Sequence, residues 1–243
     1  MSSSQSIDQI CTLLKTSLEL AGAEGYVIGI SGGVDSALAA TLCCQAVGSD
    51  RVLGVFLPSG VTPSEDADDV AALADHLGIR FSTIPIGPLL DQYRNLPNFV
   101  ETPYLLGNLM ARTRMTILYY TANRDSYLVC GTSNRTEFLL GYCTKYGDNA
   151  ADVQPLVHLL KTEVWDMARS LGVPQAIISR PPTAGLWQGQ TDEGELGLTY
   201  TEIDNAIRSL DNGSDSLVSD TEKKVLAWMG GARHKQMPAP SLL

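Results

Sequence analysis

Three observations predict an α/β fold with a doubly wound, mostly parallel sheet flanked by helices. Short apolar runs rich in β-branched residues alternate with helical patterns through the first third of the chain. A glycine-rich turn stands between the first of these runs and the helix that follows it. The chain of 243 residues is 44% hydrophobic, which is enough to bury one core of this size. We therefore expect a single domain over residues 1–243.

The first three strands are expected at 26–30, 52–57 and 81–86, where the apolar runs lie. A helix over 36–47 separates the first two, because that segment is rich in Ala and Leu and lacks a helix breaker. A second helix opens at Thr62-Pro63 with acidic residues in its first turn, as a helix N-terminus favours. The order βαβαβ predicts parallel pairing in a Rossmann-like sheet.

The alternation continues with a long helix over 108–124 and a fourth strand over 127–130. An amphipathic helix follows over 160–171. Its apolar residues recur at helical spacing, and Gly172 stops it. These elements extend the βα pattern beyond the first three strands.

Residues 180–197 break this pattern. They contain two prolines, four glycines and no periodicity, and the segment is too long for an ordinary connection. Leu186 and Trp187 would be unusual in a flexible linker, so we interpret the segment as a functional lid. Two short helices, over 202–210 and 221–229, follow it.

Composition limits the partners and the compartment of this protein. The formal net charge of −10 argues against a broad surface for nucleic acid or acidic lipid, because clustered Lys and Arg hold such partners. The five cysteines form no CxxC pair and leave an odd thiol, which favours a reducing compartment and argues against a cysteine zinc site. The sequence shows no secretory leader pattern and no apolar run of membrane-spanning length. We expect a cytoplasmic protein without a nucleic-acid or membrane partner.

The sharpest functional signal lies where the first strand meets its helix. The segment reads Gly29-Ile30-Ser31-Gly32-Gly33-Val34-Asp35-Ser36. Its glycines let the backbone approach a ligand, and the helix N-terminus offers N–H groups and a partial positive charge, so a phosphate would bind there. The alternative interpretation is an ordinary tight turn. The segment matches neither a Walker loop, which needs Gly-Lys-Ser/Thr, nor the G-x-G-x-x-G spacing.

This segment resembles the SGGxDS loop of ATP pyrophosphatases, enzymes that cleave ATP between its α and β phosphates. The resemblance implies a fold of the ATP-pyrophosphatase type and ATP binding by all eight residues of the loop. It also implies that the loop holds the leaving pyrophosphate and that Asp35 ligates Mg²⁺. The motif does not distinguish one member of the group from another.

Further motifs resemble one member of that group, the NAD synthetase family. A Gly-Thr-x4-Glu segment at 131–137 precedes a Thr-Lys-Tyr-Gly-Asp segment at 144–148, and Asp152 follows four residues later. The similarity runs from about residue 29 to about residue 237 in family order. It implies an ammonia-dependent NAD synthetase, which amidates deamido-NAD at the expense of ATP and releases NAD, AMP and pyrophosphate through an adenylated intermediate. Another amidating or thiolating ATP pyrophosphatase, or a nucleotide-binding sensor without turnover, is the alternative.

The resemblance also assigns nucleotide and metal contacts. Thr132, Lys161 and Thr183 would bind ATP together with the loop, and Asp35 and Lys161 would act in catalysis. Glu137 would join Asp35 on Mg²⁺, a hard cation that takes carboxylates, phosphates and water. Lys161 opens a helix, an unfavourable place for a cation, which favours a ligand role. The alternatives are a helix N-terminal acid for Glu137 and capping for the two threonines.

Contacts to deamido-NAD are implied for a second group of residues: Arg112, Lys145, Asp152, His234 and Lys235. The planar guanidinium of Arg112 is well shaped for phosphate groups. A His-Lys pair near a chain end is otherwise a solvated tail. Asp148 would position or deprotonate ammonia in catalysis, although an aspartate after a glycine is also typical of a turn.

The family resemblance has consequences for partners as well. It implies a homodimer whose interface helps to form the dinucleotide site. No segment resembles a glutaminase domain, so free ammonia or a separate glutaminase would supply the nitrogen. A lid over 182–195 would protect the adenylate from water. The sequence departs from many relatives at Gly185, where they carry an acid.

Overall fold

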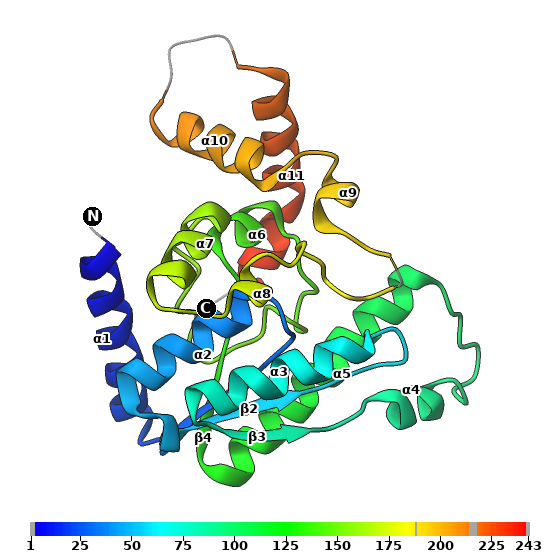
Figure 1. Ribbon diagram of the computed structural model, residues 1–243. Coiled ribbons are helices and arrows are strands. Elements are labelled where there is room, and N and C mark those ends of the chain that lie inside the picture. Colours follow the sequence, from blue (N-terminus) through cyan, green and yellow to red (C-terminus); the bar gives the residue numbers. More distant parts are fainter. Residues whose placement is uncertain (1–2, 188, 214–217, 242–243) are drawn as a thin grey trace.

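The computed structural model describes residues 3–187, 189–213 and 218–241, whose helices and strands are arranged around one sheet (Figure 1). The strands are β1 (Gly25–Gly29), β2 (Val52–Phe56), β3 (Arg80–Thr83) and β4 (Tyr127–Cys130). The helices are α1 (Ser3–Ala21), α2 (Val34–Val47), the 3-10 turn η1 (Ser49–Arg51), α3 (Ser64–Leu77), α4 (Gly87–Tyr93), α5 (Pro103–Asp125), α6 (Arg135–Leu140), α7 (Lys161–Ser170), α8 (Gln175–Ile178), α9 (Asp192–Leu196), α10 (Tyr200–Asp211) and α11 (Asp220–Gln236).

The four strands form one parallel sheet in the order β3-β2-β1-β4. In the register, Ile28 of β1 lies opposite Gly54 of β2 on one side and Cys130 of β4 on the other. Because the strands run parallel, their carboxyl ends meet at one edge of the sheet, and the glycine-rich turn follows β1 at that edge. The predicted α/β fold class is therefore confirmed.

Helices cover both faces of the sheet (Figure 1). Alternate residues of a strand point to opposite faces. Tyr26 and Ile28 thus pack with α1, α2 and α3, whereas Val27 packs with α4 and α5. β1 is buried on both sides, as expected for a central parallel strand.

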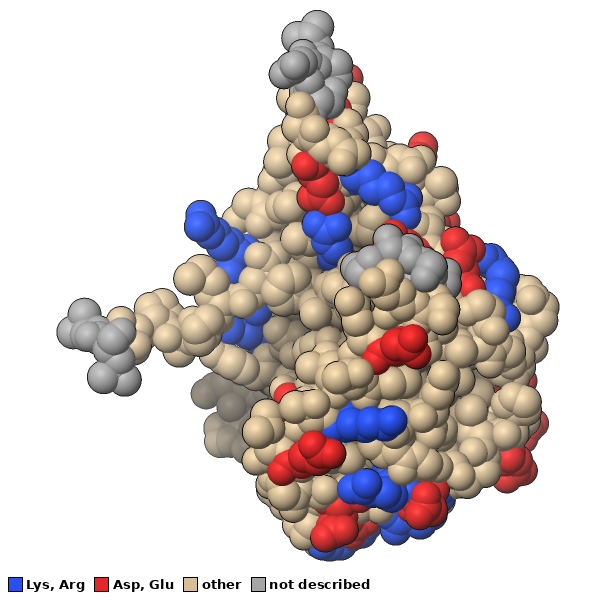
Figure 2. Space-filling view, turned by 90° about the vertical axis from the view of Figure 1, so that its left-hand side faces the viewer, with Lys and Arg blue, Asp and Glu red and all other residues tan. Residues whose placement is uncertain are grey.

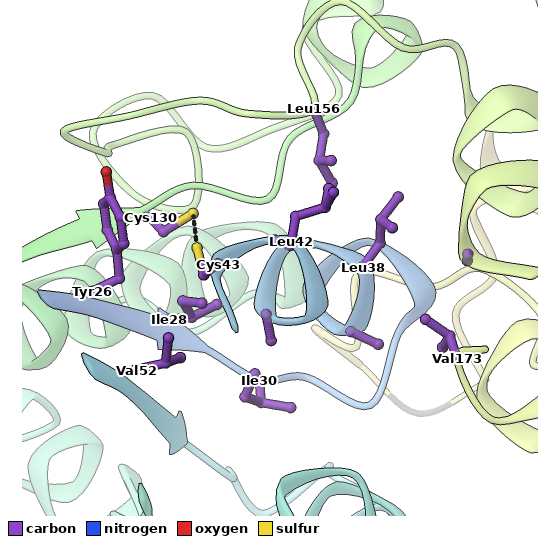
Figure 3. Packing of buried hydrophobic residues seen from close by; sticks show 14 of the residues in the cluster. Tyr26, Ile28, Ile30, Leu38, Leu42, Cys43, Val52, Cys130, Leu156 and Val173 are labelled. Atoms are coloured by element: carbon purple, nitrogen blue, oxygen red, sulfur yellow. Dashed lines mark hydrogen bonds between the residues drawn. The ribbon is translucent and has the colours of Figure 1, made fainter. Parts of the chain in front are cut away.

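The larger core cluster lies between the sheet and α2, and Figure 3 shows part of it. Leu38 and Leu42 of α2 are fully buried there. The hydroxyl of Tyr26 donates a 2.7 Å hydrogen bond to the Leu14 carbonyl of α1, so this buried polar group is satisfied. Two buried thiols, Cys43 and Cys130, lie with their Sγ atoms 3.6 Å apart.

Several elements differ from the expectations in their extent. Helix α1 was not expected in the serine-rich start, yet its apolar residues Ile7, Ile10, Leu14 and Leu18 share one face and are buried. The expected strand at 81–86 ends at Thr83, although the N–H groups of Ile84 and Ile86 still donate to the carbonyls of Phe56 and Pro58, at 2.8 and 2.9 Å.

Helices α5 and α11 are longer than expected. Helix α5 begins at Pro103 rather than at 108, because Thr102 caps it by accepting a hydrogen bond from the Leu105 N–H. Helix α11 continues to Gln236 through the two glycines at 230 and 231, well beyond the expected end at 229.

Helices α10 and α11 pack on α6 and α7 around a third apolar cluster, and in Figure 1 they rise above the sheet. In this cluster, Leu140 of α6 and Leu160, which precedes α7, pack with Ile203 of α10 and Val225 of α11. No helix in the described ranges combines the length and the apolar character needed to cross a membrane.

Gly141 controls how closely α11 approaches α6. It follows α6 in the left-handed region, at φ 62°, and an added Cβ would stand 2.4 Å from the Cβ of Ala232 in α11. Gly141→Ala should therefore lower the free energy of unfolding by at least about 1–2 kcal/mol, the cost of the backbone conformation alone. Chemical denaturation measures this change.

Gly230→Ala is the matched control, because Gly230 lies within α11 and an added Cβ would meet no atom within 4 Å. That substitution should stabilise the protein by roughly 0.5–1 kcal/mol through helix propensity. Equal effects of the two substitutions would contradict a close packing of α6 against α11.

Candidate functional site

The turn between β1 and α2 presents backbone N–H groups at the carboxyl edge of the sheet, and we refer to it as the amide-lined turn. Gly32 has φ 84°, a conformation that L side chains rarely adopt. Gly33 is the N-cap residue of α2 and has no side chain to occupy the first amides of the helix. These amides point outward at the positive end of the helix dipole, where an anion binds favourably.

Two serine hydroxyls hold this turn in shape. The Ser36 hydroxyl donates to the Gly33 carbonyl at 3.0 Å and accepts from the Ser31 N–H at 3.2 Å. The Ser31 hydroxyl in turn accepts a hydrogen bond from the Gly33 N–H at 3.2 Å. Ser36 is buried, whereas Ser31 is exposed and could turn towards a ligand. The sequence predicted these residues as a phosphate loop, and their geometry is suited to that use.

Three predicted site residues meet beside the turn in a nearly buried ion cluster. The Nζ atom of Lys161 lies 2.5 Å from Oδ2 of Asp35 and 3.3 Å from Oε1 of Glu137. Only 3% of the Lys161 side chain is exposed. The cluster joins α2, α6 and α7, which lie far apart in the sequence. Asp35 and Glu137 therefore share one site rather than lying on opposite sides of the sheet.

Burial and mutual repulsion perturb the protonation of this cluster. Burial, reinforced by the negative charge of Asp35, raises the pKa of Glu137 to about 8. Burial alone would lower the pKa of Lys161, but the charges of Asp35 and Glu137 outweigh it and raise that pKa overall. Lys161 therefore stays cationic, and the cluster carries excess negative charge when both acids are ionised.

The donor set of this cluster fits a magnesium ion. Carboxylate oxygens are the hard ligands that Mg²⁺ takes, usually one or two of them with phosphates and water completing an octahedron. Among the described residues, no group of three or more His, Cys, Asp or Glu side chains converges as a metal cage. Two adjoining carboxylates beside an anion-binding turn suit an ion that is held partly by a bound phosphate.

The two carboxylate oxygens of Glu137 have different partners, one in its own helix and one in the ion cluster. Asn134 is the N-cap of α6. Its side-chain Oδ1 accepts a hydrogen bond from the backbone N–H of Glu137 at 2.9 Å, and its backbone N–H donates to Oε2 of Glu137 at 3.3 Å. Oε1 of Glu137 faces Lys161. Glu137 therefore both caps its helix and belongs to the ion cluster, two roles that the sequence predicted as alternatives.

Two further residues, which the sequence motifs do not predict, contact this site. The Asn134 amide donates a 2.8 Å hydrogen bond to Oδ1 of Asp35 and so fixes that carboxylate. Arg180 covers the turn: its Nη1 lies 2.6 Å from the position of a Cβ on Gly32, and α3 holds the guanidinium through Asp66 and Asp69. Spacing along the chain gives no signal for either contact, because both partners are remote in sequence.

Four of the predicted dinucleotide residues lie together. Arg112 donates to the Lys145 carbonyl at 3.2 Å, and Lys145 donates through Nζ to the His234 carbonyl at 2.5 Å. Lys235 directs its Nζ to the carbonyls of Gly141 and Cys143, at 2.7 and 2.6 Å.

A cavity of about 570 Å³ lies beside Arg112. Its lining runs from Leu96 to Val100 and continues along Tyr104, Leu105 and Arg112 of α5. The Tyr104 side chain is 72% exposed at the mouth of this cavity.

The remaining predicted residues are more dispersed. Asp152 accepts from the Val129 N–H at 2.7 Å and from the Tyr119 hydroxyl at 3.3 Å, so it is tied to β4 and α5. Asp148 accepts from the Thr144 N–H at 2.8 Å, the hydrogen bond of a local turn. Thr183 is exposed, and its hydroxyl accepts from the Gly185 N–H at 3.0 Å. Thr132 is half-buried just after β4.

Part of the predicted lid, 182–195, lies beside the ion cluster. Residue 188 lies outside the described residues, but α9 starts within the lid at Asp192, which is buried and accepts a 2.9 Å hydrogen bond from the Tyr200 hydroxyl. The ring of Tyr200 has its centre 5.1 Å from Nζ of Lys161. The lid thus reaches the ion cluster through one aromatic side chain.

Comparisons with known proteins agree on one family. The family model described as NAD synthase matches residues 6–239 of this chain. A protein of Methanoregula boonei named NH(3)-dependent NAD(+) synthetase is 54% identical over 220 residues, which are 90% of this chain and 89% of that protein. One of the same name from Methanosarcina acetivorans is 45% identical over 219 residues, 88% of this chain and 86% of that protein.

Solved structures give the same result. The NMN synthetase of Francisella tularensis superposes with a TM-score of 0.90 at 37% identity, covering 99% of this chain and 98% of that one. The NH3-dependent NAD synthetase of Campylobacter jejuni superposes with a TM-score of 0.85 at 28% identity, covering 100% and 99% of the two chains.

The raised pKa of Glu137 makes the stability of the metal-free protein depend on pH. An ordinary glutamate has a pKa of 4.5, and in the folded protein that of Glu137 is about 8. Between these values the folded chain holds a proton that the unfolded chain has released, so the free energy of unfolding falls as pH rises. Glu137→Gln should flatten this decline when unfolding is compared at about pH 5 and about pH 8 in a chelator.

Glu19→Gln, at an exposed position of α1, is the control and should keep the wild-type slope. If Glu137→Gln declines with pH as steeply as the wild type, Glu137 does not carry the proton in the folded state.

Proposed function

This chain belongs to the NAD synthase family, and from that premise we propose that it amidates deamido-NAD with ammonia, giving NAD, AMP and pyrophosphate through an adenylated intermediate. The observation that carries this proposal is the Lys161 cluster with Asp35 and Glu137 beside the amide-lined turn. Such a site can hold a polyphosphate and its metal at one point. The two relatives named NH(3)-dependent NAD(+) synthetase support the use of ammonia and the formation of NAD.

The chemistry explains why the site needs ATP. A carboxylate resists attack by ammonia because it is anionic and has no good leaving group. In the proposed reaction, an oxygen of the nicotinate carboxylate attacks the α-phosphate of ATP, and the bond from that phosphorus to the bridging oxygen of pyrophosphate breaks. Ammonia then attacks the activated carbonyl carbon, loses a proton and expels AMP. Each step exchanges one bond for another without a redox change.

The turn would bind the β and γ phosphates. The first amides of α2 donate to phosphate oxygens, and the hydroxyls of Ser31 and Ser36 can add to them. The ammonium of Lys161 would neutralise charge that builds on the leaving oxygens, an electrostatic contribution made in advance of the reaction. Thr132 and Thr183 are proposed as further nucleotide contacts, on the resemblance alone.

We propose Mg²⁺ as the cofactor, held by Asp35 and Glu137. It would supply positive charge to the phosphate oxygens. Lys161 already keeps the two carboxylates adjoining, and the Asn134 amide fixes the orientation of Asp35. These side chains are thus positioned before any ligand arrives.

The cavity beside Arg112 is our proposed site for deamido-NAD. Arg112 lines this cavity, and it is connected through Lys145 to His234, so positive charge suited to phosphates lies beside it. Asp152 stands apart, and its assignment stays a prediction. Asp148 likewise stays a prediction for ammonia, because its turn hydrogen bond to Thr144 accounts for its position without a substrate.

The lid over 182–195 would exclude water from the adenylate. Leu186 packs with the apolar cluster of α5, and an added Cβ on Gly107 would stand 3.0 Å from it, so the lid already rests on the body of the protein. Exclusion of water matters because an acyl adenylate hydrolyses readily.

Charge and cysteine usage support the proposed surroundings of the enzyme. Figure 2 shows acidic and basic side chains interspersed over one face of the molecule. The five cysteines are free thiols, which suits the reducing cytoplasm that we propose as its location. Free ammonia, or ammonia from a separate glutaminase, is the proposed nitrogen source.

One observation favours a second candidate substrate. The Francisella tularensis neighbour, with a TM-score of 0.90, is named an NMN synthetase. Its substrate would be a mononucleotide that carries the same nicotinate carboxylate. The adenylation chemistry is identical for both substrates, so selectivity must come from contacts to the second nucleotide of the dinucleotide.

A direct assay tests the proposed function. The purified protein, mixed with Mg-ATP, ammonium and deamido-NAD, should form NAD and AMP in equal amounts, and deamido-NAD should be preferred over nicotinate mononucleotide in kcat/KM. Asp35→Asn should lower kcat at least about 100-fold because it removes one of the two carboxylates that would hold the Mg²⁺, whose charge would stabilise the phosphates. Asp75→Asn, at an exposed position of α3, should leave it unchanged. Preference for the mononucleotide would support the second candidate, and absence of any amide product would refute both.

We also propose a homodimer formed over the exposed apolar residues of the cavity mouth. Leu96, Val100, Tyr104 and Leu105 all expose large apolar side chains in this region. The wild type should therefore sediment at twice the mass of the 26.1 kDa chain, and Leu105→Glu should sediment as a monomer.

Leu20→Glu is the matched control for this charge insertion, because Leu20 is 85% exposed on α1. That variant should remain dimeric. A wild type that sediments as a monomer, or a dimer that survives Leu105→Glu, would show that this face is not the interface.

A further inference from the structure

We infer that Asp204 of α10 is a positioning residue for Lys161, and that it acts by capping helix α7 from outside that helix. This inference rests on the proposed function, because Lys161 is there the cation that neutralises the leaving pyrophosphate. Asp204 lies in the C-terminal third of the chain and is fully buried. The mechanism described above makes no use of it.

The first turn of helix α7 has no side-chain cap from its own N-cap residue. Its N-cap residue is Leu160, whose side chain has no oxygen to accept a hydrogen bond from the first turn. Its first residue is the cationic Lys161, which faces the positive end of the helix dipole. Leu160, Lys161 and Val164 at this end of α7 are buried. The free amides of the first turn therefore need acceptors from elsewhere in the protein.

Two neighbouring helices supply these acceptors. The Lys161 N–H donates to the Thr136 hydroxyl of α6 at 3.0 Å, and the Thr162 N–H donates to Oδ2 of Asp204 at 2.8 Å. The Thr136 hydroxyl itself donates to Oδ1 of Asp204 at 2.6 Å. Asp204 thus completes a short chain of hydrogen bonds that includes the backbone of Lys161.

Arg208, one helical turn further along α10, completes the arrangement at Thr162. It donates to the Thr162 hydroxyl at 3.0 Å, so α10 contacts both the backbone and the side chain of that residue. The negative charge of Asp204 at the start of α7 also offsets the unfavourable position of Lys161 at the helix dipole. Lys161 is consequently held by its backbone at one end and by Asp35 and Glu137 at the other.

This geometry assigns Asp204 a role in turnover and not only in folding. An ammonium on a long side chain can neutralise a developing charge only if its backbone is fixed. Thr136 precedes Glu137, so the same carboxylate restrains both the cation and one acid of the cluster. Loss of Asp204 should therefore loosen the cluster, while the substrate contacts of the turn and of Arg112 stay in place.

The decisive measurement is the split between kcat and KM in the amidation of deamido-NAD. For Asp204→Asn, whose amide places an N–H group opposite one of the two donors, we expect kcat to fall about 10- to 100-fold. KM for ATP and for deamido-NAD should stay within about threefold, because the lost interaction acts in the transition state. Thr136→Val removes the middle of the same hydrogen-bond chain, so it should show the same split, and the double variant should lose less than the product of the single losses.

Asp211→Asn is the matched control. Asp211 lies on the same helix and contacts the first residue of α6, but it does so through an exposed ion pair with Arg135 at 2.9 Å. Its kcat should match that of the wild type.

The inference is overturned if Asp204→Asn and Thr136→Val melt at lower temperatures yet turn over at the wild-type rate when assayed well below those temperatures. If Asp204→Asn does not fold, the kcat of Thr136→Val alone decides. A wild type without activity would refute the proposed function, an outcome distinct from active wild type with unaffected variants.

Discussion

The shared ion contact of Lys161 with Asp35 and Glu137 is the constraint on which the rest of the site depends. A cation with 3% of its side chain exposed is costly to bury unless carboxylates compensate it. That requirement draws the first turns of α2, α6 and α7 to one point at the carboxyl edge of the sheet. The amide-lined turn leads directly into α2, so the same contact places the first turn of that helix beside two carboxylates.

The two halves of the site carry opposite electrostatic character. The turn offers backbone amides at a helix N-terminus, whereas the cluster holds two acids against one lysine. A phosphate chain with a bound divalent ion carries both kinds of complementary charge. It can therefore bind both halves at once. A phosphate chain alone would be repelled by the two carboxylates, and a divalent ion alone would be repelled by the positive end of the helix.

Local patterns predicted much of this arrangement. The strand, the glycine turn and the helix from 26 to 47 follow from periodicity and from the conformational needs of glycine, and the predicted parallel sheet is present. Asn134 and Asp204 were not predicted. Their partners Asp35 and Thr136 lie 99 and 68 residues away, and neither periodicity nor motif spacing reports on contacts at that range. Helix α1 was missed for another reason, because the serine-rich start obscured its apolar face.

Helix α6 shows how a remote part of the chain sets the geometry of the cluster. Near its start, Asp204 holds Thr136, and at its end the cation of Lys235 binds the Gly141 and Cys143 carbonyls, where the helix dipole is negative. The six-residue helix that carries Glu137 is thus gripped at both ends by α10 and α11. The ammonium of Lys235 has a third N–H donor beyond these two hydrogen bonds, so it can offer that donor to a dinucleotide phosphate while it stays at the end of α6.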